Sequence, residues 1–266
     1  MVVKLTMLTT PLENPPSHFS YRDDATIQNV VDRLANDHAD LRMLDCGCGD
    51  ARLAKAMMET GSVDLNRIRY FGFDSDQTLV RSVKSEKERE VFSNYKEFDV
   101  RLHDITDPLA YEDRSFDLIL VNNIIHEIAA KDIAQVVLKL NKLLTDPKGR
   151  LAVIDMEELP LEVCEPWAVP LTADELGKTL RAGGFKPAIS RHHKRVWTYR
   201  VVIGPISQVN TDGITLALRK ILSKKREQQL AVAAKYHACG DISADSQREA
   251  CRMAAVELAI HQLKGM

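Results

Sequence analysis

Acidic residues end three short apolar runs of the chain, and a pair of glycines follows the first of them. The first run ends at Asp45 and leads directly into Gly47 and Gly49, the second ends at Asp74, and the third ends at Asp104. Glycine allows a tight turn and lets the backbone approach a ligand closely. Carboxylates accept hydrogen bonds from ribose hydroxyls and from amino groups. The pattern therefore predicts a site for a nucleotide-like ligand.

Two of these carboxylates also have a purely structural interpretation. Asp74, or Ser75 after it, can cap the helix that is expected to follow. Asp104 stands shortly before the turn residues Asp107-Pro108 and can belong to that turn. Capping and ligand binding are compatible, so both interpretations stay open.

A fourth motif follows the most apolar run of the chain, residues 116–122. It reads Asn-Asn-Ile-Ile-His-Glu and ends with His126 and Glu127. An imidazole is suited to proton transfer near neutral pH, which makes His126 the candidate base. Glu127 can orient it or bind a cationic substrate. Alternatively, both residues simply begin a helix, where a carboxylate is favourable.

Along the chain, short apolar runs alternate with helical patterns, and these elements must position the residues named above. Apolar strands that alternate with helices indicate a parallel sheet covered on both faces. The runs 185–191 and 196–203 are separated only by His192-His193-Lys194. This spacing predicts a hairpin, so that one strand lies antiparallel in an otherwise parallel sheet. The histidine pair is assigned to the turn, and no ligand spacing supports a metal site.

The chain divides into three parts. Residues 1–23 are expected to form an N-terminal arm, residues 24–205 the α/β domain, and residues 206–266 a helical C-terminal extension. The extension shows two amphipathic patterns, 214–237 and 246–264. The second pattern opens on Ser246-Gln-Arg-Glu249, which is typical of a capping box.

Composition excludes several classes of protein. The 266 residues carry 36 Lys and Arg against 38 Asp and Glu, so no overall positive charge attracts a nucleic acid. Apolar stretches are too short to span a membrane. Five scattered cysteines do not form a disulfide framework. A cytoplasmic location is expected.

The succession of motifs carries a resemblance to a known family. LDCGCGD, FGFDSD, LHDITD and SFDLILVNNIIHEI resemble, in order and spacing, the class I S-adenosylmethionine-dependent methyltransferases over residues 24–203. The fourth motif is similar to the broad group that reads FDxIxxxxxxHH there. The resemblance implies a Rossmann-like sheet of seven strands with an antiparallel last strand, and S-adenosyl-L-methionine as cofactor.

The same resemblance implies a role for individual residues at the methionine end of the cofactor. Asp45, Gly47 and Gly49 would form the loop around its methionine part. Asn122 would present its backbone carbonyl to the cofactor's amino group. Tyr21-Arg22 would belong to a lid that closes over the site.

At the nucleoside end, the resemblance implies two further pairs of residues. Asp74, with Ser75 beside it, would hold the ribose hydroxyls. Asp104 would hold the amino group of adenine while Ile105 packs against the ring.

The acceptor of the methyl group carries no motif of its own. Asn122-Asn123 departs from the Asn-Pro-Pro-aromatic motif of nucleic-acid amino methyltransferases, and the fourth motif has no cysteine for covalent chemistry on cytosine. A small-molecule acceptor is therefore favoured. A binding or regulatory module with this fold is an alternative function. A dinucleotide-dependent oxidoreductase is disfavoured, because Arg52 stands where its last glycine is required.

The first helix of the C-terminal extension has two interpretations. An RNA methyltransferase that uses this basic helix, residues 219–235, is an alternative function. Otherwise its charges are a solvated face, opposite an apolar stripe that packs on the domain or on a second copy in a homodimer. The basic residues are Arg219, Lys220, Lys224, Lys225, Arg226 and Lys235.

Overall fold

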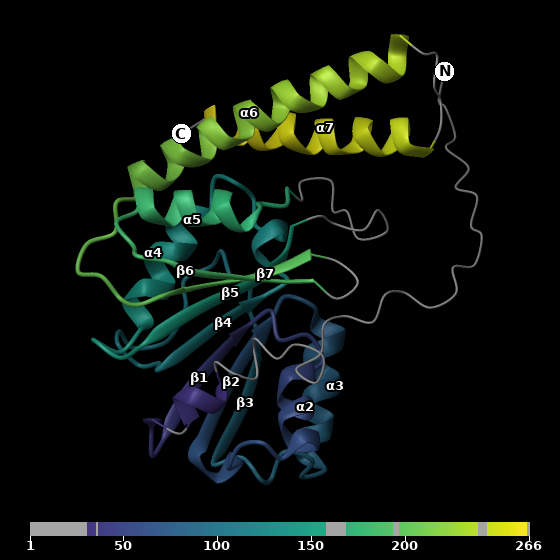
Figure 1. The fold of residues 1–266 in the computed structure, drawn as a ribbon. Helices are drawn as coiled ribbons and strands as arrows, with labels where there is room; N and C mark the ends of the chain where they lie inside the picture. Colours follow the sequence, from purple (N-terminus) through teal and green to yellow (C-terminus); the bar gives the residue numbers. More distant parts are fainter. Residues whose placement is uncertain (1–30, 36, 158–168, 194–196, 239–243, 265–266) are drawn as a thin grey trace.

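A seven-stranded mixed sheet forms the centre of the molecule, with strand order β3-β2-β1-β4-β5-β7-β6 (Figure 1). The computed structural model describes residues 31–35, 37–157, 169–193, 197–238 and 244–264. Strands β1 to β5 pair in parallel, whereas β7 runs antiparallel to both β5 and β6. This confirms the predicted α/β class and the antiparallel last strand. The strands are β1 (Leu41–Cys46), β2 (Ile68–Asp74), β3 (Glu97–Leu102), β4 (Leu118–Asn122), β5 (Arg150–Met156), β6 (Ala188–His193) and β7 (Trp197–Ile203).

Helices cover both faces of the sheet, because successive side chains of a buried strand point to opposite sides. In β1, Leu44 and Cys46 pack into one hydrophobic cluster, and Leu41 and Met43 into the other. The first cluster lies under α4, α5 and α6, and the second under α2 and α3. The helices are α2 (Arg52–Thr60), α3 (Gln77–Glu88), α4 (Ile133–Leu143), α5 (Ala173–Ala182), α6 (Thr211–Ala238) and α7 (Ala244–Lys264), with short 3₁₀ helices η1 (Leu65–Arg67) and η2 (Ile125–Glu127).

The hairpin at the end of the sheet corrects one expectation. His192 and His193 are the last residues of β6 and pair with Thr198 and Trp197 of β7. Their polar side chains favour a turn. The strand tolerates them because β6 is an edge strand. The connection between the strands is left to residues 194–196, which lie outside the described part.

The two helices of the predicted C-terminal extension are present and lie side by side over α5 (Figure 1). α6 packs on the domain through Ile214, Leu218 and Leu222, each at most 1% exposed. The predicted capping box at Ser246 is wrong as a helix start, because α7 begins at Ala244 and Ser246 lies within its first turn. None of the helices in the described ranges is long and apolar enough to cross a membrane.

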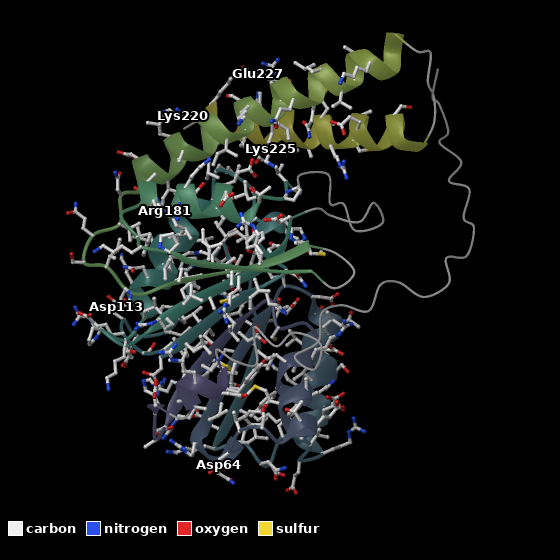
Figure 2. All side chains as sticks on the ribbon, in the orientation of Figure 1. Asp64, Asp113, Arg181, Lys220, Lys225 and Glu227 are labelled. Atoms are coloured by element: carbon white, nitrogen blue, oxygen red, sulfur yellow. The ribbon has the colours of Figure 1, made fainter. Side chains whose placement is uncertain are left out.

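Several basic residues of α6 are engaged within the chain. Lys225 forms an ion pair of 2.8 Å with Glu175 of α5, and Arg226 pairs with Glu257 of α7. Arg219 donates to the backbone carbonyl of Leu263. Figure 2 shows Lys225 on the side of α6 that faces the domain and Lys220 on the outer side. The basic residues therefore do not form one continuous free surface.

Candidate active site

A cleft of about 390 Å³ opens at the carboxyl ends of β1, β2, β3 and β4. In parallel sheets, ligands bind at this edge, where the strand order reverses. Here the reversal lies between β1 and β4, because β2 and β3 follow on one side and β5 on the other. The lining residues are Gly47, Phe73, Asp74, Ser75, His103, Asp104, Ile105, Thr106, Ile124, Glu127, Ile128, Ala129 and Asp132.

The glycine loop after β1 has a backbone that ordinary residues rarely adopt. Gly47 and Gly49 have φ angles of 70° and 56°. A Cβ atom on Gly47 would lie 2.4 Å from Cδ1 of Ile124, so this position has no room for a side chain. At Gly49 a Cβ would meet nothing within 4 Å. The loop thus packs tightly against Ile124 on one side and leaves open space at Gly49.

Asp74 ties the ends of β1 and β2 together. Its Oδ2 accepts the backbone N–H of Gly49 at 2.8 Å, and its Oδ1 accepts the N–H of Asp76 at 2.8 Å. The cap of α3 is Asp76, which accepts the N–H groups of Thr78 and Leu79, so the capping role considered for Asp74 and Ser75 is wrong. Each carboxylate oxygen has further acceptor capacity, which is available for a diol.

Asp104 follows β3, and only one of its two carboxylate oxygens is bonded to its own loop. Its Oδ1 accepts both the N–H and the hydroxyl of Thr106, each at 2.7 Å. These bonds from Thr106, more than the surrounding charges, hold the pKa of Asp104 below its usual value. The carboxylate therefore stays ionised, and its other oxygen is left to accept from a ligand. Ile105 beside it lines the same cleft.

Asp45 and Asn122 lie deeper than the cleft wall. Asp45 is 3% exposed, and its carboxylate accepts the hydroxyl of Tyr70 at 2.6 Å. Burial raises the pKa of Asp45 to about 7, although the Tyr70 bond opposes the shift. Oδ1 of Asn122 is buried and has no hydrogen-bond partner among the described residues. Neither side chain lines the cleft, so any contact there would come through the backbone next to them.

His126 lies in η2 next to the cleft residue Glu127, and it is itself buried, with 2% of its surface exposed. Its Nδ1 is 2.7 Å from Oδ1 of Asp155, and its backbone N–H donates to Oδ2 of Asp155 at 3.1 Å. Burial by itself would lower the pKa of His126, but the hydrogen bond and charge of Asp155 outweigh it, and the net shift is upward. The structure thus brings His126 and a buried carboxylate together as a dyad.

The second ring nitrogen of His126 has no hydrogen-bond partner in the described part of the chain. This Nε2 is buried and lies 3.8 Å from Oε1 of Glu127, which lines the cleft. Because Nδ1 faces Asp155, Nε2 is the ring nitrogen left for a further proton donor or acceptor.

Sequence reasoning missed Asp155. It is 0% exposed at the end of β5 and also accepts the backbone N–H of Met156 at 2.7 Å. A signal was available, because Asp155 ends an apolar run just as Asp45, Asp74 and Asp104 do. The lid residues Tyr21-Arg22 lie outside the described residues.

The residues present fit the cofactor that the sequence resemblance implies. Asp74 and Asp104 have acceptor capacity left for hydroxyl and amino groups, and Ile105 supplies an apolar surface for a ring. The open space at Gly49 allows a ligand to approach the backbone. No group of three potential metal ligands occurs among the described residues.

Comparisons with known proteins agree with this geometry. Residues 37–186 match the methyltransferase domain family. A highly reducing polyketide synthase from Aspergillus nomiae is 27% identical over 136 residues, which are 49% of this chain and 5% of the synthase. The chain therefore spans about one-twentieth of the length of this curated relative.

Two solved structures share the fold. A magnesium protoporphyrin IX methyltransferase from Synechocystis PCC 6803, with bound S-adenosylhomocysteine, is 18% identical and has a TM-score of 0.52. The similarity covers 68% of this chain and 82% of that one. An S-adenosylmethionine-dependent methyltransferase from Methanosarcina mazei is 13% identical, with a TM-score of 0.52, and covers 69% of this chain and 98% of its own.

The family match covers more than half of the chain, and the α/β fold resembles that of the two solved methyltransferases. The alternative of a binding module without enzymatic activity is therefore not supported. The chain belongs to the methyltransferase domain family and is a methyltransferase with S-adenosylmethionine as its cofactor.

Proposed function

We propose that this enzyme methylates a small-molecule acceptor that loses a proton during the reaction, and that His126 takes this proton. The observation that carries the proposal is the buried dyad: Asp155 holds Nδ1 of His126 at 2.7 Å and leaves Nε2 without a hydrogen-bond partner in the described residues. Such an arrangement fixes the tautomer of the imidazole and orients its free nitrogen.

The cofactor would lie along the carboxyl edge of the sheet. Asp74 and Ser75 would hold the ribose, and Asp104 and Ile105 the adenine. The loop of Asp45, Gly47 and Gly49, together with the backbone carbonyl of Asn122, would enclose the methionine part. Asp45 would act indirectly, since its side chain is bonded to Tyr70 and shapes the loop from behind.

The chain's own contribution to catalysis is alignment and proton transfer. The bound cofactor supplies a methyl carbon activated by the neighbouring sulfonium, so the protein must mainly hold donor and acceptor in line. Nε2 of His126 would accept the acceptor's proton, and the carboxylate of Asp155 would stabilise the resulting imidazolium. Glu127, which lines the cleft beside His126, would orient the acceptor.

A small-molecule acceptor is favoured over RNA by the C-terminal helices. An RNA-binding surface on residues 219–235 would need free basic side chains. Lys225 and Arg226 instead form ion pairs with Glu175 and Glu257. The curated relative is by its name a polyketide synthase, not an enzyme of nucleic acids.

The test is to separate cofactor binding from turnover in variants of the dyad. His126→Gln removes the base, and Asp155→Asn keeps the shape of its partner but removes the charge. A positioned general base contributes about 10²- to 10⁴-fold. We expect losses of this order in the turnover of bound methyl donor with an accepted small molecule, and nearly unchanged cofactor affinity by calorimetry. His261→Gln, on the exposed side of α7, is the matched control.

The pH profile adds a readout that a structural role would not move. Because Asp155 raises the pKa of His126, the neutral imidazole forms only at a pH above the ordinary histidine value. Activity should therefore rise with pH through that raised value, and Asp155→Asn should move the rise to lower pH. Loss of cofactor binding in both variants would show instead that His126 is structural.

Three further expectations from the sequence remain proposals. The domain boundaries at residues 23/24 and 205/206 can be tested by limited proteolysis. A homodimer through the C-terminal helices can be tested by analytical ultracentrifugation, and a cytoplasmic location by cell fractionation.

A further inference from the structure

Lys139 of α4 holds the loop that follows β3 by three hydrogen bonds. Its ammonium group donates to the backbone carbonyls of three consecutive residues, Ile105, Thr106 and Asp107, at 2.8, 2.8 and 2.7 Å. An ammonium group has three N–H donors, so all of them are used on this loop. No motif in the sequence pointed to this residue.

These three carbonyls face α4, and the opposite side of the same loop faces the cleft. Ile105 and Thr106 line the cleft together with Asp104. The N–H of Thr106 donates back to Oδ1 of Asp104 at 2.7 Å. Because the peptide group is planar, fixing the carbonyls of residues 105–107 also fixes the directions of the neighbouring N–H groups. The orientation of Asp104 is therefore coupled to Lys139 through the loop backbone.

The start of the loop is anchored separately. The N–H of His103 donates to the backbone carbonyl of Asp74 at 2.9 Å, and its ring packs edge-on against Phe73. β3 is an edge strand of the sheet, so no strand from the described part of the chain supports it on its outer side. Lys139 supplies the support for residues 105–107, which directly follow Asp104.

We propose that Lys139 is a positioning residue for recognition of the adenine base, acting through the loop that carries Asp104 and Ile105. This inference rests on the proposed placement of adenine at Asp104. The ammonium group holds the loop so that the free oxygen of Asp104 meets the amino group of the base. Without it, the carboxylate loses its fixed direction and the site loses discrimination between bases.

The experiment compares two ligands that differ only at the base. At C6 of the base, S-adenosylhomocysteine carries an amino group that can donate to Asp104. S-inosylhomocysteine carries a carbonyl oxygen at C6 and a hydrogen on the neighbouring N1, so the donor at C6 is lost. Calorimetry of both ligands with the full chain gives the ratio of their affinities. Lys139→Met removes the three donors at nearly the same length, and Lys142→Met makes the same change at an exposed position of the same helix.

We expect the preference for the adenine ligand to fall roughly fivefold or more in Lys139→Met, as for the loss of one oriented hydrogen bond. Lys142→Met should keep the preference of the unmodified enzyme. Lys139→Arg, which retains several donors, should restore part of the preference. Thermal denaturation of each variant checks that it is folded.

The outcomes distinguish the role of Lys139 from the proposed placement of adenine at Asp104. If Asp104→Asn removes the preference but Lys139→Met leaves it unchanged, or weakens both ligands equally, the role of Lys139 is wrong while the placement of adenine stands. If Asp104→Asn also leaves the preference unchanged, adenine does not lie at Asp104 and both proposals fail.

Discussion

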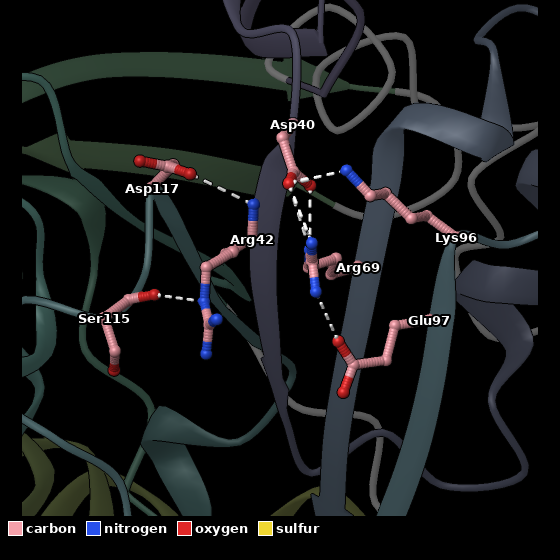
Figure 3. Close-up of polar contacts among 7 residues, drawn as sticks. All are labelled: Asp40, Arg42, Arg69, Lys96, Glu97, Ser115 and Asp117. Carbon is pink, nitrogen blue, oxygen red and sulfur yellow. Dashed lines mark hydrogen bonds and ion pairs between the residues drawn. The ribbon is translucent and has the colours of Figure 1, made fainter.

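Carboxylate side chains lie at both edges of the sheet, but they have different kinds of partner at each edge. At the amino edge, Asp40 accepts from Arg69 at 2.9 Å and from Lys96 at 2.7 Å, and Glu97 accepts from Arg69 at 3.0 Å (Figure 3). At the carboxyl edge, Asp74 and Asp104 form no ion pair with lysine or arginine within the described residues. Asp74 accepts the N–H groups of Gly49 and Asp76, and Asp104 accepts the N–H and hydroxyl of Thr106.

This difference indicates that the carboxylates of the amino edge stabilise the fold, whereas those of the carboxyl edge are available to a ligand. The Arg69 guanidinium beside Asp40 holds the pKa of that carboxyl at about 2. Asp40 and Glu97 are both ion-paired there. Next to it, Asp117 accepts the N–H of Arg42 at 3.0 Å and joins β1 to β4. The carboxylates at the other edge keep unused acceptor capacity, which is what a ligand with several donors requires.

The largest effect is expected on the pH dependence of the free energy of unfolding, because the pKa values of Asp40 and Asp45 are shifted in opposite directions. The pKa of Asp45 is raised to about 7, so the folded state holds a proton there that the unfolded chain releases above about pH 4. Stability should therefore fall as pH rises from about 4 to 7, by up to about 4 kcal/mol. Asp45→Asn should remove this fall, as measured by urea unfolding across that range.

Asp40 should show the reverse sign. Its lowered pKa contributes stability that is present above about pH 4 and is lost as pH falls towards 2. Asp40→Asn should therefore flatten only the acid side of the profile. Parallel profiles for Asp45→Asn and the unmodified enzyme would contradict the contrast between the two edges.

A second prediction concerns cofactor affinity. Asp74→Ala removes the acceptor of the Gly49 N–H and the acceptor that we propose for the ribose hydroxyls. Leaving such donors unpaired costs about 1–3 kcal/mol, so S-adenosylmethionine should bind roughly 5- to 150-fold more weakly by calorimetry. Asp40→Ala, at the paired edge, is the control and should leave the affinity unchanged. An equal effect of both substitutions would mean that the loss comes from general destabilisation.

The smallest effect is expected on α6, where paired and unpaired charges lie on one helix. Lys225→Ala removes the half-buried ion pair with Glu175 and should lower the free energy of unfolding by about 0.5–1 kcal/mol. Lys220→Ala, on the outer side of α6 (Figure 2), should change it by less than about 0.5 kcal/mol. RNA binding that is lost in Lys220→Ala would instead support the alternative acceptor class.

The sequence determined the class of fold and the position of the cleft. Runs of apolar residues that each end in a carboxylate place Asp74 and Asp104 at one edge, because parallel strands end on the same side of the sheet. The glycines at positions 47 and 49 are also readable from the sequence. Their φ angles are positive, and residues other than glycine rarely adopt such angles. Short-range patterns carry this information because secondary structure depends on neighbouring residues.

Only the tertiary structure decided which groups become partners. Asp155 lies 29 residues from His126, and Lys139 lies 34 residues from Ile105. The sequence around them does not reveal these bonding partners. Whether a carboxylate is ionised or protonated depended likewise on burial and neighbours, as the contrast between Asp40 and Asp45 shows. Hydrogen bonds and desolvation act between residues that folding brings together, so spacing along the chain does not encode them directly.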